Sequence, residues 1–249
     1  MRIPRFYQAD LFTIGECIDL DPTNFRHAIQ VMRLSVGDPL ILFNGESGEY
    51  SAQIAAVDRR SARVDIISFD SISRESSLDI CLVIALIKPD KMDFAIQKAV
   101  ELGVTSIQPI LTDRAVIRMK ATRLEKKLAH WQSVIHSACE QSGRTAIPII
   151  KPAVQSTDCL QHTSQRQRVL MSPRANQDFF SLNKSTPPFD LIIGPEGGFS
   201  DNEEQVLALQ SIHQVQFGCR ILRAETAVVT GLTALQLIAG DCHTQEQAL

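Results

Sequence analysis

The chain of 249 residues carries 44% hydrophobic and 21% charged side chains, the balance of a globular protein and not of a disordered one. Its net charge of −3 argues against a protein that holds nucleic acid by bulk charge alone. No apolar run reaches the roughly 20 residues of a membrane span and no signal-peptide core follows Met1, so we expect a cytosolic protein.

Cysteines, histidines and local charge narrow the possible functions. The 6 cysteines and 6 histidines are scattered without ligand spacing, which favours reduced thiols over a metal site, a disulfide framework or a Ser-His-Asp triad. Residues 76–150 carry 10 basic and 7 acidic side chains and are the only net-positive third of the chain. A polyanion is expected to contact this third, although solvated helix faces explain its lysines equally well.

Residues 1–72 have the pattern of a strand-rich module. Short apolar runs between turn residues predict strands at 39–43, 51–57 and 63–67, with one helix around 24–32. A module of this size is expected to be a small β-barrel. The polar segment 73–77 follows it as a linker.

From residue 78 onward, buried strands alternate with amphipathic helices. The apolar run 78–86 is typical of a strand buried on both faces of a parallel sheet, and further strands are expected at 106–111, 168–171, 190–193 and 214–218. Helices are expected at 92–102 before Gly103, at 122–142 before Gly143, after a capping box of Ser200 and Glu203, and at 227–239. The pattern predicts an α/β domain over 78–240, with a polar tail at 241–249.

Two glycine-bearing loops follow predicted strands of this domain. Gly194-Pro195-Glu196-Gly197-Gly198 lets backbone N–H groups approach a ligand, but it matches neither GxGxxG nor a P-loop, and an ordinary tight turn explains it as well. In the second loop, 217–227, the residues that precede the last helix can simply cap it. Both loops lie at carboxyl ends of strands, where a parallel sheet builds its ligand crevice.

Two charged segments precede these loops. Glu140-Gln141-Ser142-Gly143-Arg144 ends the middle helix, where Arg144 either complements the helix dipole or serves a site. Lys91 and Lys98 are seven residues apart and share a helix face, so they can contact phosphates or remain solvated.

In combination these segments point to one family. The motifs KPDKMDFAIQKAVELGV, EQSGR, GPEGGFS and FGCRILRAETA occur in the order of the RsmE-type, SPOUT-class ribosomal RNA methyltransferases, and the chain resembles this family from Ile3 to about Ala239. The resemblance implies a PUA-like β-barrel before a SPOUT domain whose C-terminal chain forms a trefoil knot. It also implies a homodimer that uses S-adenosylmethionine to methylate N3 of a uridine in 16S rRNA of the small ribosomal subunit. Strand and helix spacing alone predicts an open sheet, because threaded chains are rare.

The resemblance also implies site residues. For the cofactor they are Leu170, Met171, Gly194, Pro195, Glu196, Gly197, Gly198, Phe217, Gly218, Ile221, Leu222, Arg223, Glu225, Thr226 and Ala227. Position 217 is often leucine in relatives. Glu196 and Glu225 are candidate proton acceptors, and Arg144 and Arg223 are candidates to stabilise a deprotonated uridine. The expected RNA contacts are Arg2, Arg5, His27, Arg33, Lys88, Lys91 and Lys98.

Two other functions stay open at this point. A non-catalytic RNA-binding or ribosome-assembly factor can keep the same scaffold, but it would bind no cofactor. An α/β nucleotide-binding enzyme is disfavoured because phosphate-loop and Rossmann signatures are missing. No metal is expected.

Overall fold

The structure, a computed structural model, describes residues 3–46, 48–114, 121–161, 165–182 and 188–242. The chain forms two compact units: Met1–Glu75 with Cys139–Ile147, and Ser76–Ala138 with Pro148–Leu249. The first division falls inside the expected linker 73–77. The segment Cys139–Ile147, which the sequence analysis placed in the second domain, packs with the first unit. None of the described helices is long and apolar enough to cross a membrane.

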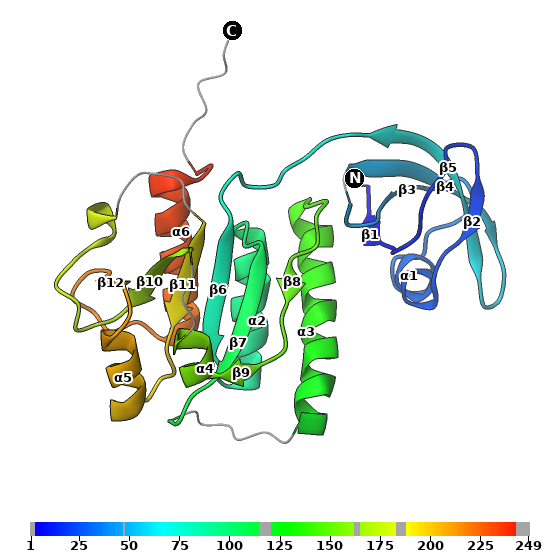
Figure 1. The fold of residues 1–249 in the computed structure, drawn as a ribbon. Coiled ribbons are helices and arrows are strands. Elements are labelled where there is room, and N and C mark those ends of the chain that lie inside the picture. The colour runs from blue at the N-terminus through cyan, green and yellow to red at the C-terminus, as the bar shows by residue number, and fades with distance from the viewer. Residues whose placement is uncertain (1–2, 47, 115–120, 162–164, 183–187, 243–249) are drawn as a thin grey trace, which may run out of the picture. The chain divides into compact units, whose positions relative to one another are not determined.

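A parallel sheet of seven strands forms the centre of the second unit (Figure 1). Its strands are β6 (Ile80–Ala85), β7 (Ser106–Leu111), β8 (Ile149–Ile150), β9 (Val154–Gln155), β10 (Gln167–Met171), β11 (Phe189–Ile193) and β12 (Ile212–Val215). Their order is β12-β10-β11-β6-β7-β8, with β9 also paired to β7. β6 and β11 are buried throughout, because helices cover both faces. The predicted α/β fold is confirmed.

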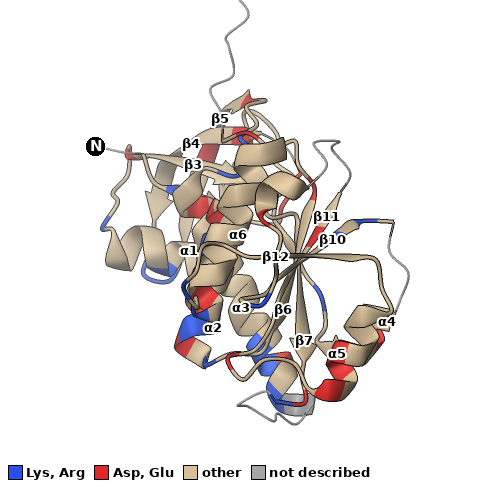
Figure 2. Ribbon diagram, turned by 90° about the vertical axis from the view of Figure 1, so that its left-hand side faces the viewer, with Lys and Arg blue, Asp and Glu red and all other residues tan. Residues whose placement is uncertain are grey.

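Helices lie on both faces of this sheet (Figure 2). The helices are α2 (Pro89–Glu101), α3 (Ala121–Ser142), α4 (Ser156–Gln161), α5 (Asp201–Ala208) and α6 (Ala224–Ala239), with the 3₁₀ turn η2 (Phe179–Ser181). Figure 2 shows α2 and α6 on one face and α4 and α5 on the other. α6 approaches the sheet closely at Gly231, where a Cβ would lie 2.6 Å from Sδ of Met171 and 2.9 Å from Cδ2 of Leu191.

The sequence located most of these elements and misplaced two boundaries at the second loop. The capping box of Ser200 and Glu203 forms as predicted, and Gly103 follows α2 with a φ of 81°. β12 ends at Val215 instead of 218, because this edge strand carries mainly exposed polar residues. α6 begins three residues earlier than expected. The trefoil knot stays a prediction, since residues 183–187 between β10 and β11 lie outside the described part of the chain.

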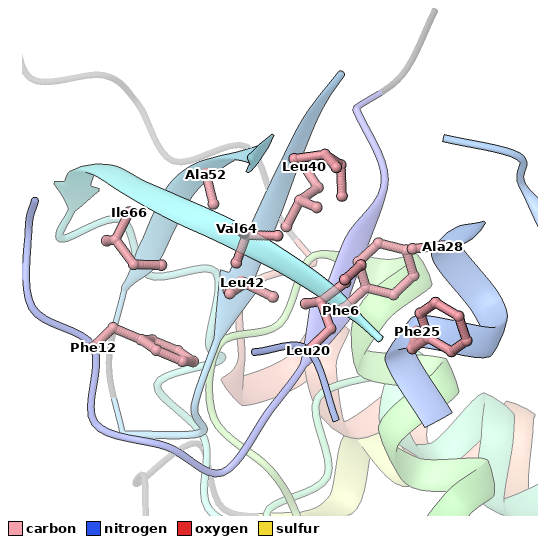
Figure 3. Packing of buried hydrophobic residues seen from close by; sticks show 12 residues of the cluster. Phe6, Phe12, Leu20, Phe25, Ala28, Leu40, Leu42, Ala52, Val64 and Ile66 are labelled. Atoms are coloured by element: carbon pink, nitrogen blue, oxygen red, sulfur yellow. The ribbon is translucent and has the colours of Figure 1, made fainter. Parts of the chain in front are cut away.

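The first unit is built on a five-stranded sheet of order β1-β3-β4-β5-β2. Its strands are β1 (Arg5–Tyr7), β2 (Cys17–Asp19), β3 (Pro39–Phe43), β4 (Glu49–Val57) and β5 (Ala62–Asp70). The expected helix begins as α1 (Pro22–Phe25), capped by Asp21, and continues as the π-helical segment η1 (Arg26–Val31). Figure 3 shows the core of this unit, in which Phe6, Leu42 and Val64 lie among side chains from the strands and from α1.

Arg5 is a buried structural residue of this unit, and its role as an RNA contact stays a prediction. Its buried guanidinium donates to the carbonyl oxygens of Cys139 at 2.8 Å, Glu140 at 3.0 Å and Arg144 at 3.0 Å. It also lies 3.1 Å from the carboxylate of Glu49. Both carbonyls lie in the last turn of α3, where helix carbonyls run out of partners within the helix; that of Cys139 also accepts from the N–H of Gly143 at 3.1 Å. Arg5 therefore caps α3 and complements its dipole.

Further polar bonds hold the residues after α3 in the first unit. Glu75 accepts a hydrogen bond from the backbone N–H of Thr145 at 3.0 Å and pairs with the Arg144 guanidinium at 2.6 Å. Arg74, from the expected linker, donates to the carbonyl of Gly143 at 3.0 Å. Burial in this segment raises the pKa of Cys139 to about 12. Residues 74 and 75 are thus part of the folded unit.

Arg5→Met is expected to lower the free energy of unfolding by about 2 kcal/mol, because buried carbonyls lose their charged donor and Glu49 keeps only Arg74 as a cationic partner. Urea denaturation followed by circular dichroism measures this change. Arg59→Met is the matched control, since it removes an exposed arginine from the same unit, and it should change stability by less than about 0.5 kcal/mol. Equal stabilities of the two variants would contradict the capping role.

Candidate active site

The carboxyl ends of β10, β11 and β12 meet at one edge of the sheet. The parallel register sets Leu170 beside Ile192 and Met171 beside Val215. β10 lies between the two strands that follow it in the chain, so the connections around it run in opposite directions. Parallel sheets bind ligands at such a switch point, outside the carboxyl ends of the strands.

Ion pairs occupy the opposite edge of the same sheet. Nη1 of Arg166 lies 2.6 Å from Oδ2 of Asp79, and its Nε lies 2.7 Å from Oδ1 of Asp190. The hydrogen bond from Arg166 is the main cause that holds the pKa of Asp79 below its usual value. These pairs fix the amino ends of the strands and leave the carboxyl edge as the candidate site.

The first glycine loop presents backbone to solvent. The N–H of Gly198 donates to the carbonyl of Pro195 at 2.9 Å, which closes a tight turn, and Gly198 has a left-handed φ of 70°. Pro195 is buried, whereas Glu196 and the two glycines after it are exposed. A Cβ on Gly197 would only reach ordinary contacts of 3.6 Å with Arg114. The loop therefore offers open backbone and one carboxylate.

The end of β7 holds this loop in place, a contact that sequence reasoning missed. Nη1 of Arg114 donates to the carbonyl of Phe199 at 2.8 Å, and its Nη2 lies 3.2 Å from Asp201. The hydroxyl of Ser200 donates to Asp113 at 2.6 Å. Their position in the sequence could have pointed to this contact. Asp113 and Arg114 follow the predicted strand 106–111 and therefore lie at the same carboxyl edge of the sheet as the loop.

Glu203 is a fully buried carboxylate that joins three segments at this edge. It accepts hydrogen bonds from the backbone N–H groups of Asp113 at 3.1 Å and Ser200 at 2.8 Å, and from the hydroxyl of Ser156. A buried charge is stable only when its lone pairs are satisfied in this way. Glu203 therefore fixes the first loop to β7 and α4.

The second loop, residues 216–223, combines apolar side chains with open backbone. The N–H of Gln216 donates to the carbonyl of Gln177 at 2.8 Å, and Phe217 meets Phe179 edge-on with ring centroids 6.3 Å apart. No described residue hydrogen-bonds to residues 218–222. Ile221 is 85% exposed. Apolar contacts beside free backbone donors and acceptors are what a small heteroaromatic ligand requires.

The start of α6 brings two predicted functional residues together. Glu225, in the first turn, is buried, and its Oε1 lies 3.5 Å from Nζ of Lys91 on α2. Lys91 and the positive end of the helix dipole both complement this carboxylate. Arg223 immediately precedes the helix and is exposed. Lys91, expected at RNA phosphates, thus lies at the candidate active site.

Other predicted cofactor and catalytic residues have different surroundings. The side chain of Leu170 packs in a core cluster with Leu160 and Phe199, and Met171 packs under Gly231, so only their backbone groups are left for a ligand. Arg144 belongs to the first unit, where it pairs with Glu75.

The residues predicted to contact RNA differ in their exposure and in the partners of their side chains. Lys88 and Arg33 are exposed, and the ring of His27 meets that of Phe6 edge-on. Lys98 pairs with Glu101 at 2.8 Å. Arg2 lies outside the described residues. Among the described residues, no group of three or more His, Cys, Asp or Glu side chains is arranged to hold a metal ion.

Comparison with known proteins identifies both units. A family described as the RNA methyltransferase domain matches residues 74–236, and one described as the RNA methyltransferase PUA domain matches residues 20–67. The fold is therefore that of an RNA methyltransferase domain preceded by a PUA domain.

Full-length relatives narrow the class. The ribosomal RNA small subunit methyltransferase E of Buchnera aphidicola subsp. Schizaphis graminum is 33% identical over 96% of this chain and 98% of its own length. The enzyme of the same name from Neisseria gonorrhoeae, solved with S-adenosylmethionine, is 33% identical, with a TM-score of 0.90 over 97% of this chain and 100% of its own. A Legionella pneumophila protein solved with the same cofactor is 34% identical, with a TM-score of 0.94 over the same shares. The chain belongs to the ribosomal RNA small subunit methyltransferase E family.

Glu203→Ala is expected to lower the free energy of unfolding by about 2 kcal/mol, because it removes the α5 cap and leaves buried donors unpaired. Thermal unfolding measures the loss. Glu204→Ala, at the next and exposed position of the same helix turn, should cost less than about 0.5 kcal/mol. A Glu203→Ala variant as stable as Glu204→Ala would show that the carboxylate does not hold the loop.

Proposed function

We propose that the chain transfers a methyl group from S-adenosylmethionine to N3 of one uridine in 16S rRNA of the small ribosomal subunit. The observation that carries this proposal is the convergence of the loops 194–198 and 216–223 beside the end of β10 in a member of this family. Two relatives that match nearly the whole chain were solved with the same cofactor. With this activity we expect the protein in the cytoplasm.

The residues at the carboxyl edge fit this cofactor. Phe217, Ile221 and Leu222 offer apolar contacts to an adenine ring, and the open backbone of both loops offers hydrogen bonds to its polar edge. The proposed site comprises the backbone of Leu170 and Met171, the loop Gly194, Pro195, Glu196, Gly197 and Gly198, and the segment Phe217, Gly218, Ile221, Leu222, Arg223, Glu225, Thr226 and Ala227. When bound, the cofactor supplies a methyl group activated by its sulfonium.

The chain's own residues must position the uridine and take its N3 proton. Glu225 is the better-placed acceptor, because Lys91 and the start of α6 hold it, whereas Glu196 is exposed on its loop. Arg223 is placed to stabilise the negative charge that spreads to O2 and O4 of the base. Arg144 is engaged with Glu75 in the first unit, so no step is assigned to it.

The function is tested by mass spectrometry of nucleosides from small-subunit rRNA. Cells that lack this gene should lack one 3-methyluridine, and the wild-type gene should restore it. Glu225→Gln should restore at most about 1% of the modification rate, because a general base contributes roughly 10²–10⁴-fold. Glu204→Gln, an exposed glutamate on α5, is the control and should restore it fully. Persistence of 3-methyluridine in the deletion strain would contradict the assignment, and restoration by an inactive variant would favour a non-catalytic factor.

We also propose that the protein is a homodimer formed by the second unit. α6 carries apolar side chains beyond its buried stripe, among them Leu237, which is 57% exposed. An apolar surface wider than one stripe is typical of a helix with a partner.

Light scattering at micromolar concentration should therefore give twice the mass of the chain. Leu237→Lys should shift the mass toward that of a monomer, because burying an unpaired charge disfavours association. Leu209→Lys, at a leucine after α5 that is 84% exposed, should leave the mass unchanged. A monomeric wild-type protein with full activity would refute the dimer.

A further inference from the structure

Arg33 has a backbone conformation that arginine rarely adopts. Its φ is 62°, in the left-handed region, and every other described residue with a positive φ is a glycine. A side chain with a Cβ is strained in this conformation. Strain of this kind is concentrated where a particular side chain serves a function.

The end of η1 imposes this conformation. The N–H of Met32 donates to the carbonyl of His27 at 2.9 Å, and the N–H of Leu34 donates to that of Ala28 at 2.9 Å. Leu34 then packs against the core of the first unit, so the chain must reverse at Arg33. Helix ends of this type usually place glycine at the reversal. Glycine would therefore suit the backbone better than the arginine that is present.

The residues around Arg33 form an exposed surface that we name the η1 corner: Arg26, Val31, Met32, Arg33 and Val36. Its three apolar side chains are largely exposed: Val31 by 66%, Met32 by 47% and Val36 by 62%. Arg26 and Arg33 are exposed, and their side chains form no hydrogen bond or ion pair with a described residue. The segment 26–37 contains no acidic residue.

The η1 corner differs from the arginines that hold the first unit together. Arg5, Arg74 and Arg144 are all paired with carboxylates or carbonyls inside the unit. Two unpaired guanidinium groups beside exposed apolar side chains match RNA with accessible bases, because they can pair with phosphates while the apolar groups lie against base or ribose faces. π-helical turns such as η1 are also frequent at functional sites.

We propose that the η1 corner is the surface through which the first unit contacts rRNA, with Arg33 as its central phosphate contact. The inference rests on the proposed function and adds the surface that brings the substrate to the enzyme. It also explains why an arginine occupies a strained backbone position: its side chain is needed to recognise the RNA.

The test is Arg33→Gly in the full-length protein, with S-adenosylmethionine and small subunits from cells that lack the gene. Loss of one charged hydrogen bond should raise the KM for subunits about tenfold. The kcat and the KM for S-adenosylmethionine should stay within about twofold. Relief of the strained φ should raise the Tm by about 2 °C, which separates lost recognition from lost structure.

Two matched variants complete the design. Arg33→Lys keeps the charge and should recover most of the affinity for subunits. Arg59→Gly removes an exposed arginine from the β4–β5 turn of the same unit without relieving strain, and its KM for subunits should stay within about twofold of wild type. An unchanged KM for Arg33→Gly, with wild-type enzyme active, would overturn the inference. Inactive wild-type enzyme with intact subunit binding would instead overturn the proposed function.

Crosslinking identifies the partner of the corner directly. A benzophenone amino acid at Val36 should crosslink to rRNA in small subunits when irradiated, and the same group at Val57, exposed on β4, is the position control. Crosslinks from position 36 to ribosomal protein alone would overturn an RNA contact.

Discussion

The pairing of β10 with a later strand on each side is the constraint on which the candidate site depends. β11 and β12 are separated in sequence by α5, yet both are in parallel register with β10. Neighbouring strands lie roughly 4.8 Å apart, so the loops that leave β11 and β12 are only two strand spacings apart. α6 then returns across the sheet to β11, and the glycine at 231 allows it to approach the strands without a gap. A site built from two loops follows from this strand order.

Two buried charged groups hold the less regular parts of each unit. Glu203 satisfies backbone donors from two segments around the first glycine loop, and Arg5 satisfies carbonyls at the end of α3. In both cases one ionic side chain replaces several backbone bonds that irregular chain cannot make with itself. Hydrophobic burial forms the two cores, but these groups fix the loops that the cores leave undetermined. The precision of the site therefore depends on polar bonds.

The sequence predicted what depends on local pattern. Apolar runs located β3, β6 and β7, and the Ser200–Glu203 capping box and Gly103 marked helix ends that the structure confirms. It missed β1 and β2, because three residues are too few to show a period of two. It also missed the structural role of Arg5, since an arginine on the surface and one that caps a helix 134 residues away look identical in sequence. The loops were located from glycines, whereas the Arg114 and Glu203 contacts needed the tertiary fold.

The segment Cys139–Ile147 has a consequence for how the protein is made. The N-terminal unit emerges first from the ribosome, but Arg5 and Glu75 find their backbone partners only when this segment has followed. At synthesis rates of about 5–20 residues per second, the sheet of the first unit waits several seconds for the chain that completes it. During that interval the guanidinium of Arg5 and the carboxylate of Glu75 lack their backbone partners and remain hydrated. The first unit therefore cannot finish folding when its own 75 residues have been made, and a fragment cut at the linker would be permanently held at that intermediate stage.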